Sequence, residues 1–180
     1  MIRWFRALLS GGRRTAGRGL HHRPVDAGDG TAAPEPTPGE APPAGRAERR
    51  QVAALPWRRG PDGVEILLVT SRETRRWVTP KGGRMAGKTD AEAAAQEALE
   101  EAGVEGVVGE RPLGSFRYLK VLKRRAARWC AVDLYGLEVT VEHADWQERA
   151  ERERVWLPRE EAARRVDEPD LQALIAAFRP

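Results

Sequence analysis

The sequence predicts an α/β (α+β) fold in which helices flank a mixed β-sheet. Three observations support this prediction: the apolar strand-like run at 64–71, a helix with clear start and stop signals at 90–102, and two short helical segments near the C-terminus. Strands and helices that alternate along a chain are typical of a sheet that is covered by helices.

The chain divides by composition near residue 47. Its first 46 residues hold six of the 13 prolines and eight of the 18 glycines and contain almost nothing to bury. We therefore expect 1–46 to be a disordered Arg/Pro/Gly-rich tail, and 47–180 to form one domain. The first fifty residues also carry the whole net charge of +4, so a globally basic, DNA-coating domain is not indicated.

The lengths of the apolar runs and the number of cysteines indicate where the protein is located. No apolar run approaches the roughly 20 residues that a membrane-spanning helix needs, so we expect no membrane span. Cys130 is the only cysteine and cannot form an internal disulfide, which fits a reducing cytoplasm. We therefore expect a cytoplasmic protein, and leave open whether it is a monomer or a homodimer.

The elements of the domain follow in order. Residues 50–58 and 64–71 are predicted strands around a turn at 60–63, and the second is apolar enough to lie centrally in a sheet. A short strand at 77–79 leads into a glycine-rich loop at 80–87. The later predicted elements are strands 113–121, 128–142 and 153–157 and helices 158–166 and 168–178.

The helix at 90–102 has signals at both ends. Thr89 and Glu92 form a capping-box pattern at its start, and Gly103 supplies its C-terminal stop. Between them lie alanine and other good helix formers.

Three glutamates share one face of this helix, because Glu97, Glu100 and Glu101 stand at positions i, i+3 and i+4. Each like-charged pair at these spacings costs about a few tenths of a kcal/mol. No basic residue occupies the neighbouring helical positions, so the charge must be neutralised from outside the helix. A hard divalent cation, Mg²⁺ or Mn²⁺, would do this and would bridge to phosphate oxygens. A merely solvated acidic face is the alternative.

The run PKGGRMAG immediately precedes this helix. Gly82 and Gly83 permit a close approach of the backbone to a ligand, and Lys81 can meet phosphate charge. A strand, a glycine-rich turn and a capped helix with three acids together predict a site for metal ions and phosphate groups.

From Gly82 to Val104 the chain resembles the signature of the Nudix hydrolases, G-x5-E-x7-R-E-U-x-E-E-x-G-U, in which U is aliphatic. The matching residues are Gly82, Glu97, Glu100, Glu101, Gly103 and Val104. Lys88 stands where the signature has its first Glu, and Gln96 stands where it has Arg. The resemblance implies a Nudix-type α/β/α sandwich and a metal site formed by the three glutamates.

The resemblance covers most of 49–178 and is closest to the diphosphoinositol polyphosphate and diadenosine polyphosphate branch, in the runs LLVTSRETRRWVTPKGG and DWQERAERERVWLPREEA. It implies a metal-dependent pyrophosphohydrolase in which water attacks phosphorus. The substrate would be nucleoside-diphosphate-linked, a dinucleoside polyphosphate or an inositol pyrophosphate. Glu100 and Glu101 are the candidate catalytic residues, one of them as general base. The candidates for binding substrate phosphates are Arg72, Lys81 and Arg50.

Two other functions remain open. Because Lys88 and Gln96 depart from the signature, the domain could bind a nucleotide or polyphosphate without turnover. The basic segment 120–128 could instead serve as the rim of an RNA 5′-end pyrophosphohydrolase. We expect a small phosphorylated substrate and no stable nucleic-acid partner.

Overall fold

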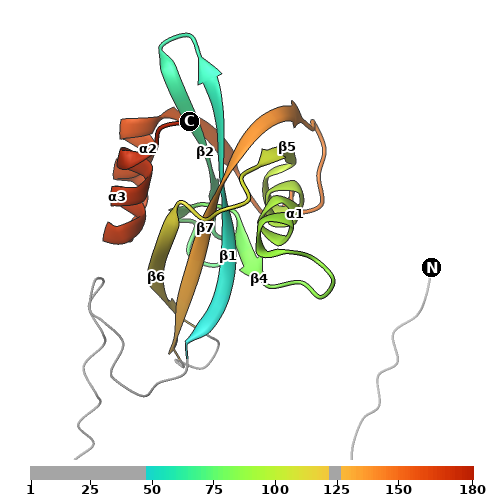
Figure 1. Cartoon of the computed structure of the whole chain (residues 1–180), viewed down its shortest axis with the longest axis vertical. Coiled ribbons are helices and arrows are strands. Elements are labelled where there is room, and N and C mark those ends of the chain that lie inside the picture. The colour runs from blue at the N-terminus through green and yellow to red at the C-terminus, as the bar shows by residue number, and fades with distance from the viewer. Residues whose placement is uncertain (1–47, 122–126) are drawn as a thin grey trace, which may run out of the picture. The chain divides into compact units, whose positions relative to one another are not determined.

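The computed structural model describes residues 48–121 and 127–180. A mixed sheet lies between α1 (Asp90–Ala102) on one face and α2 (Arg159–Arg165) with α3 (Pro169–Ala177) on the other (Figure 1). The predicted fold class is thus confirmed. Within the described residues, no helix is long and apolar enough to cross a membrane. The predicted tail, 1–46, lies outside them.

Within the described residues, the sheet has eight strands. They are β1 (Arg49–Gly60), β2 (Gly63–Thr70), β3 (Trp77–Val78), β4 (Lys81–Gly83), β5 (Val104–Val108), β6 (Gly114–Val121), β7 (Ala127–Glu142) and β8 (Arg154–Pro158). The order along the sheet is β3-β2-β1-β7-β5, while β4 pairs with β1, β6 with β7 and β8 with β2. Among the strands of the described residues, β1 and β7 pair in parallel, and all other pairs are antiparallel. The central strands therefore give the sheet its mixed character.

Both faces of the sheet are covered, which explains why the central strands read as continuous apolar runs. Along β1, Val52 and Ala54 belong to the core under α1, whereas Ala53 and Leu55 belong to the core under α2 and α3. Successive side chains of a strand point to opposite faces, so two packed faces require apolar residues at every position.

Helix α1 begins and ends where the sequence predicts. The Thr89 hydroxyl accepts a hydrogen bond from the Glu92 backbone N–H at 3.2 Å, and the Glu92 carboxylate accepts one from the Thr89 N–H at 2.7 Å. Gly103 ends the helix with a φ of 64°, a left-handed conformation that glycine adopts without strain. Fully buried alanines line the face toward the sheet, so the helix can lie close to it.

Two strands were not predicted. Strand β4 lies inside the predicted loop 80–87, because β2 pairs with β1 only from Trp57 onward and leaves Gln51–Ala53 free to pair with β4. Strand β5 pairs with the end of β7, with a register shift between Glu105 and Gly106. In both cases a tertiary partner overrides weak local signals.

The capping box should contribute measurably to stability. We expect Thr89→Ala to lower the free energy of unfolding by about 1 kcal/mol, because the capping box that satisfies two backbone N–H groups at the start of α1 is broken. Thr89→Ser, which keeps the hydroxyl, should stay close to wild type in urea denaturation. Equal losses in both variants would show that the lost stability does not come from the capping hydroxyl.

Candidate active site

The acidic face of α1 meets strand β4 at Glu97. A Cβ atom added to Gly82 would lie 1.8 Å from Oε1 of Glu97, so residue 82 can carry no side chain while this carboxylate keeps its place. The antiparallel pairing of Gly82 with Val52 holds the backbone there. The glycine of the sequence motif is therefore needed for space beside a carboxylate.

Glu101 is buried and has partners on both of its oxygens. The backbone N–H of Lys81 donates to Oε2 at 3.1 Å, and the guanidinium of Arg152 pairs with Oε1. The side chains of Arg152 and Glu101 are only 6% and 9% exposed. The charge of Glu101 is thus neutralised by a residue from a distant part of the chain.

Arg152 and Glu148 also belong to the site, although no pattern in the sequence points to either of them. Arg152 donates to Glu148 at 2.5 Å and to the carbonyl oxygen of Thr70, at the end of β2, at 2.9 Å. The Glu148 N–H also donates to the carbonyl oxygen of Glu100 at 3.1 Å, which ties this segment to α1. The segment preceding β8 therefore adds a fourth carboxylate and an arginine.

Two carboxylates of the site, Glu97 and Glu101, have a raised pKa. Burial first, and then neighbouring negative charges, raise the pKa of Glu97 to about 7. Those charges belong to Glu101, Glu100 and Glu148, while Arg152 acts in the opposite direction. Burial also raises the pKa of Glu101, against the lowering effect of Arg152. The negative charge of the site therefore exceeds the positive charge that Arg152 supplies.

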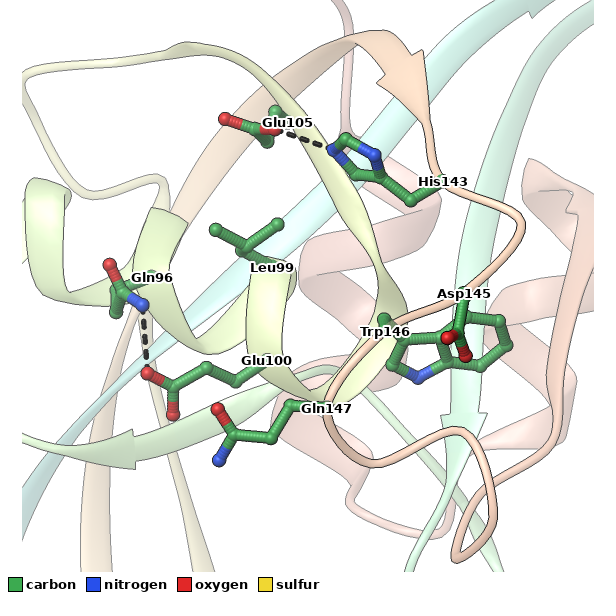
Figure 2. Close-up of a pocket in the computed structure, with 8 residues that line it drawn as sticks. All are labelled: Gln96, Leu99, Glu100, Glu105, His143, Asp145, Trp146 and Gln147. Carbon is green, nitrogen blue, oxygen red and sulfur yellow. Dashed lines mark hydrogen bonds and ion pairs between the residues drawn. The ribbon is translucent and has the colours of Figure 1, made fainter.

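Glu100 lies at the outer side of the acidic face. Gln96 donates a hydrogen bond from Nε2 to Oε1 of Glu100 at 2.7 Å. Both line an open pocket of about 270 Å³, and Figure 2 shows the Gln147 side chain near Glu100 in it. The other lining residues are Leu99, Glu105, His143, Asp145 and Trp146.

The three candidate phosphate-binding cations lie at different places. Arg72 follows β2, is 54% exposed and contacts Glu148 at 3.2 Å, so it joins the site through that carboxylate. Lys81 places its ammonium 5.3 Å from the centre of the Tyr118 ring, in the direction opposite to Glu97. Arg50 is 60% exposed and pairs with Asp133 at 3.2 Å. Of these three cations, only Arg72 contacts the acidic residues of the site with its side chain.

Lys81 has an unusual environment. Burial lowers its pKa to about 8, although the charge of Glu101 opposes this change. No ion pair to its ammonium is present within the described residues, while nearby Arg76 pairs with the buried Glu168 at 2.6 Å. Lys81 is thus a partly desolvated cation beside the acidic face, separated from it by the backbone of β4.

The oxygen donors of the site fit a hard divalent cation, although the side chains do not form a complete set of metal ligands. Carboxylate oxygens are the ligands that Mg²⁺ and Mn²⁺ prefer. Within residues 48–121 and 127–180, however, no group of three or more potential ligand side chains is close enough together to hold a metal ion. Arg152 occupies one oxygen of Glu101 instead. Metal binding at Glu101 would therefore use the lone pairs that Arg152 and Lys81 leave free, or require Arg152 to shift.

The chain matches a family model and is similar to proteins that are named as hydrolases. The family model for the NUDIX domain matches residues 47–178. Nudix hydrolase 12, mitochondrial, of Arabidopsis thaliana is 40% identical over 102 residues, which are 55% of this chain and 50% of that protein. Diphosphoinositol polyphosphate phosphohydrolase 3-beta of Bos taurus is 33% identical over 116 residues, 63% of this chain and 66% of that protein. The chain thus spans about half to two thirds of these relatives, and its cytoplasmic location stays a prediction.

Solved structures agree in fold. An Ap4A hydrolase of C. elegans has a TM-score of 0.50 at 20% identity and covers 72% of this chain and 95% of its own. A NUDIX hydrolase of Nitrosomonas europaea has a TM-score of 0.55 at 18% identity, with coverages of 72% and 87%. With the family model matched over nearly the whole of residues 48–180, the chain belongs to the Nudix family.

Proposed function

We propose that the chain is a divalent-metal-dependent pyrophosphohydrolase, which cleaves a phosphoanhydride bond by attack of water at phosphorus. One observation carries the proposal: Glu97 packs against Gly82, and burial together with the negative charges of Glu101, Glu100 and Glu148 raises its pKa to about 7. A site with excess negative charge is suited to divalent cations, which in turn attract the phosphate groups of a substrate.

The proposed cofactor is Mg²⁺ or Mn²⁺, since the family generally uses divalent metals. Glu97, Glu100 and Glu101 would hold it, with Glu148 as a fourth oxygen donor. A bound cation supplies a more acidic water and neutralises charge that develops on the phosphate. If Arg152 released Glu101, it would still hold Glu148, because its Nε contacts Glu148 and its Nη2 contacts Glu101.

Glu100 is the better candidate for the general base. Both oxygens of Glu101 already accept hydrogen bonds, from Lys81 and Arg152, and its side chain is buried. The Glu100 carboxylate lines an open pocket and accepts a single hydrogen bond from the described residues, at Oε1. Its other oxygen can therefore take a proton from water.

The proposed substrate class is a nucleoside-diphosphate-linked compound, a dinucleoside polyphosphate or an inositol pyrophosphate. Arg72 contacts Glu148 from the end of β2, so it could meet a phosphate beside the acidic residues, whereas Lys81 would meet only a phosphate on its own side of β4. Arg50, which Asp133 already neutralises in part, would contact only a more distant phosphate.

A binding module without turnover is the second candidate. Two observations favour it. In the described residues, no three potential ligand side chains lie close enough together to hold a metal ion, and Lys88 and Gln96 depart from the motif. Calorimetry with Mg²⁺ and a non-hydrolysable polyphosphate, beside a turnover assay, separates the two. Tight binding with no product from any hydrolysable analogue would favour the module.

The proposed activity is tested with a substrate panel at several Mg²⁺ and Mn²⁺ concentrations. The panel should contain nucleoside diphosphate derivatives, diadenosine polyphosphates, inositol pyrophosphates and 5′-triphosphorylated RNA. We expect metal-dependent product from at least one of the first three, and reaction in ¹⁸O-labelled water should put the label in a phosphate group. Label in a non-phosphate product would refute attack at phosphorus.

Removing single carboxylates should abolish turnover without unfolding the protein. We expect Glu100→Gln and Glu101→Gln each to lower kcat by about 100-fold or more, because a general base or metal ligand is lost. Glu110→Gln, at an exposed glutamate outside the site, is the matched control. Circular dichroism checks the fold. Wild-type rates in both site variants would show the mechanism to be wrong.

The raised pKa of Glu97 predicts a pH-dependent stability of the metal-free protein. The unfolded chain releases this proton near pH 4.5 and the folded protein near 7, so the folded state binds more protons between these values. Stability should therefore fall as the pH rises from about 4.5 to 7, by about 1–2 kcal/mol after allowance for solvent screening at this half-buried side chain.

Denaturation in EDTA at pH 5 and pH 7.5 measures this change. Glu97→Gln should remove most of it, and Mn²⁺ should stabilise the wild-type protein at the higher pH. An identical pH dependence in wild type and variant would contradict the assigned role of Glu97.

A further inference from the structure

A chain of two hydrogen bonds connects the loop before α1 to Glu100. The ammonium of Lys88 donates to Oε1 of Gln96 at 2.9 Å, and Nε2 of Gln96 donates to Oε1 of Glu100 at 2.7 Å. Figure 2 shows the second of these bonds. These are the two positions at which the chain departs from the family motif, and here they contact each other.

The three groups admit only one orientation of the Gln96 amide. An ammonium has donors and no acceptor, and an ionised carboxylate has acceptors and no donor. The amide must therefore turn its oxygen to Lys88 and its nitrogen to Glu100. The opposite orientation would place the amide oxygen against the carboxylate and the NH₂ group against the ammonium, and both hydrogen bonds would be lost.

Backbone features place the three residues for this contact. Gly87 has a φ of 76°, and the N–H of Lys88 donates to the carbonyl oxygen of Met85 at 3.3 Å, so the loop turns just before Thr89 caps the helix. Gln96 and Glu100 are four residues apart on α1 and so are neighbours on its surface. The conformation of the loop is thus coupled to the side chain of Glu100.

We infer that Lys88 is a positioning residue, which fixes the orientation of the Gln96 amide and, through it, the side-chain conformation of Glu100. The Lys88–Gln96 pair connects loop and helix through a neutral amide, and no cation among residues 48–121 and 127–180 contacts Glu100 directly. Within the described residues, no cation thus competes with a metal ion for the Glu100 carboxylate. The catalytic consequence rests on the proposed function, but the positioning itself does not.

The first test observes the amide directly in the metal-free protein. The sequence has four glutamines and no asparagine, so a ¹H–¹⁵N spectrum contains only four side-chain amide pairs, and Gln96→Met identifies the pair that belongs to Gln96. We expect Lys88→Met to shift that pair. Arg84→Met, which removes a cation of the same loop that contacts Asp90, should leave it in place. An unshifted Gln96 amide in Lys88→Met would overturn the inference.

The second test uses charge reversal and rescue. In Lys88→Glu the new carboxylate should attract the NH₂ group of Gln96 and turn its oxygen toward Glu100. We expect Mn²⁺ affinity, measured by calorimetry without substrate, and kcat each to fall about tenfold, the equivalent of one lost hydrogen bond to a charged group, with KM nearly unchanged. Gln96→Arg alone places two cations together and should also lose affinity.

The double variant Lys88→Glu/Gln96→Arg should recover to within about threefold of wild type, because donor and acceptor are exchanged together. Losses that simply add in the double variant would overturn the inference, as would equal Mn²⁺ affinities in Lys88→Met, Arg84→Met and wild type. Absence of turnover in the wild-type protein would count against the proposed function alone, since amide shifts and Mn²⁺ affinities would still decide the role of Lys88.

Discussion

The buried ion pair between Arg152 and Glu101 is the interaction on which the acidic face depends. Arg152 also contacts Thr70 and Glu148, so a single guanidinium joins the end of β2, helix α1 and the segment before β8. Buried charges are tolerated only when each has partners, and Glu101 meets this condition with a second hydrogen bond from the backbone of β4. The protein thus supplies a cation of its own at a place where metal chemistry is proposed.

The local part of the fold could be predicted from the sequence. Helix α1 has its predicted bounds because a capping box, a run of alanines and a terminal glycine all act within a few residues of the helix. Strands β4 and β5 could not be predicted in this way. Lys81–Gly83 and Val104–Val108 are short and contain glycine, and each becomes a strand only because β1 or β7 offers it an edge.

The candidate site shows the same division between local and distant signals. Helical spacing placed Glu97, Glu100 and Glu101 on one face, and it found no cation within a turn of them. The neutralising residue, Arg152, lies 51 residues beyond Glu101, so no pattern within the helix could reveal it. Strand alternation likewise turns Lys81 away from the glutamates, although Lys81 and Gly82 are adjacent in the sequence motif.

The parallel pairing of β1 with β7 has a consequence for how the chain folds during synthesis. Arg49 lies opposite Cys130, so the centre of the sheet cannot form until most of the domain has left the ribosome. Pairings between such distant segments are slow to form and leave strand edges open meanwhile. Strand β1 is apolar and is synthesised first, so its edge toward β7 stays unpaired until β7 is made. A chaperone that covers the open edge of β1 would therefore raise the yield of native protein.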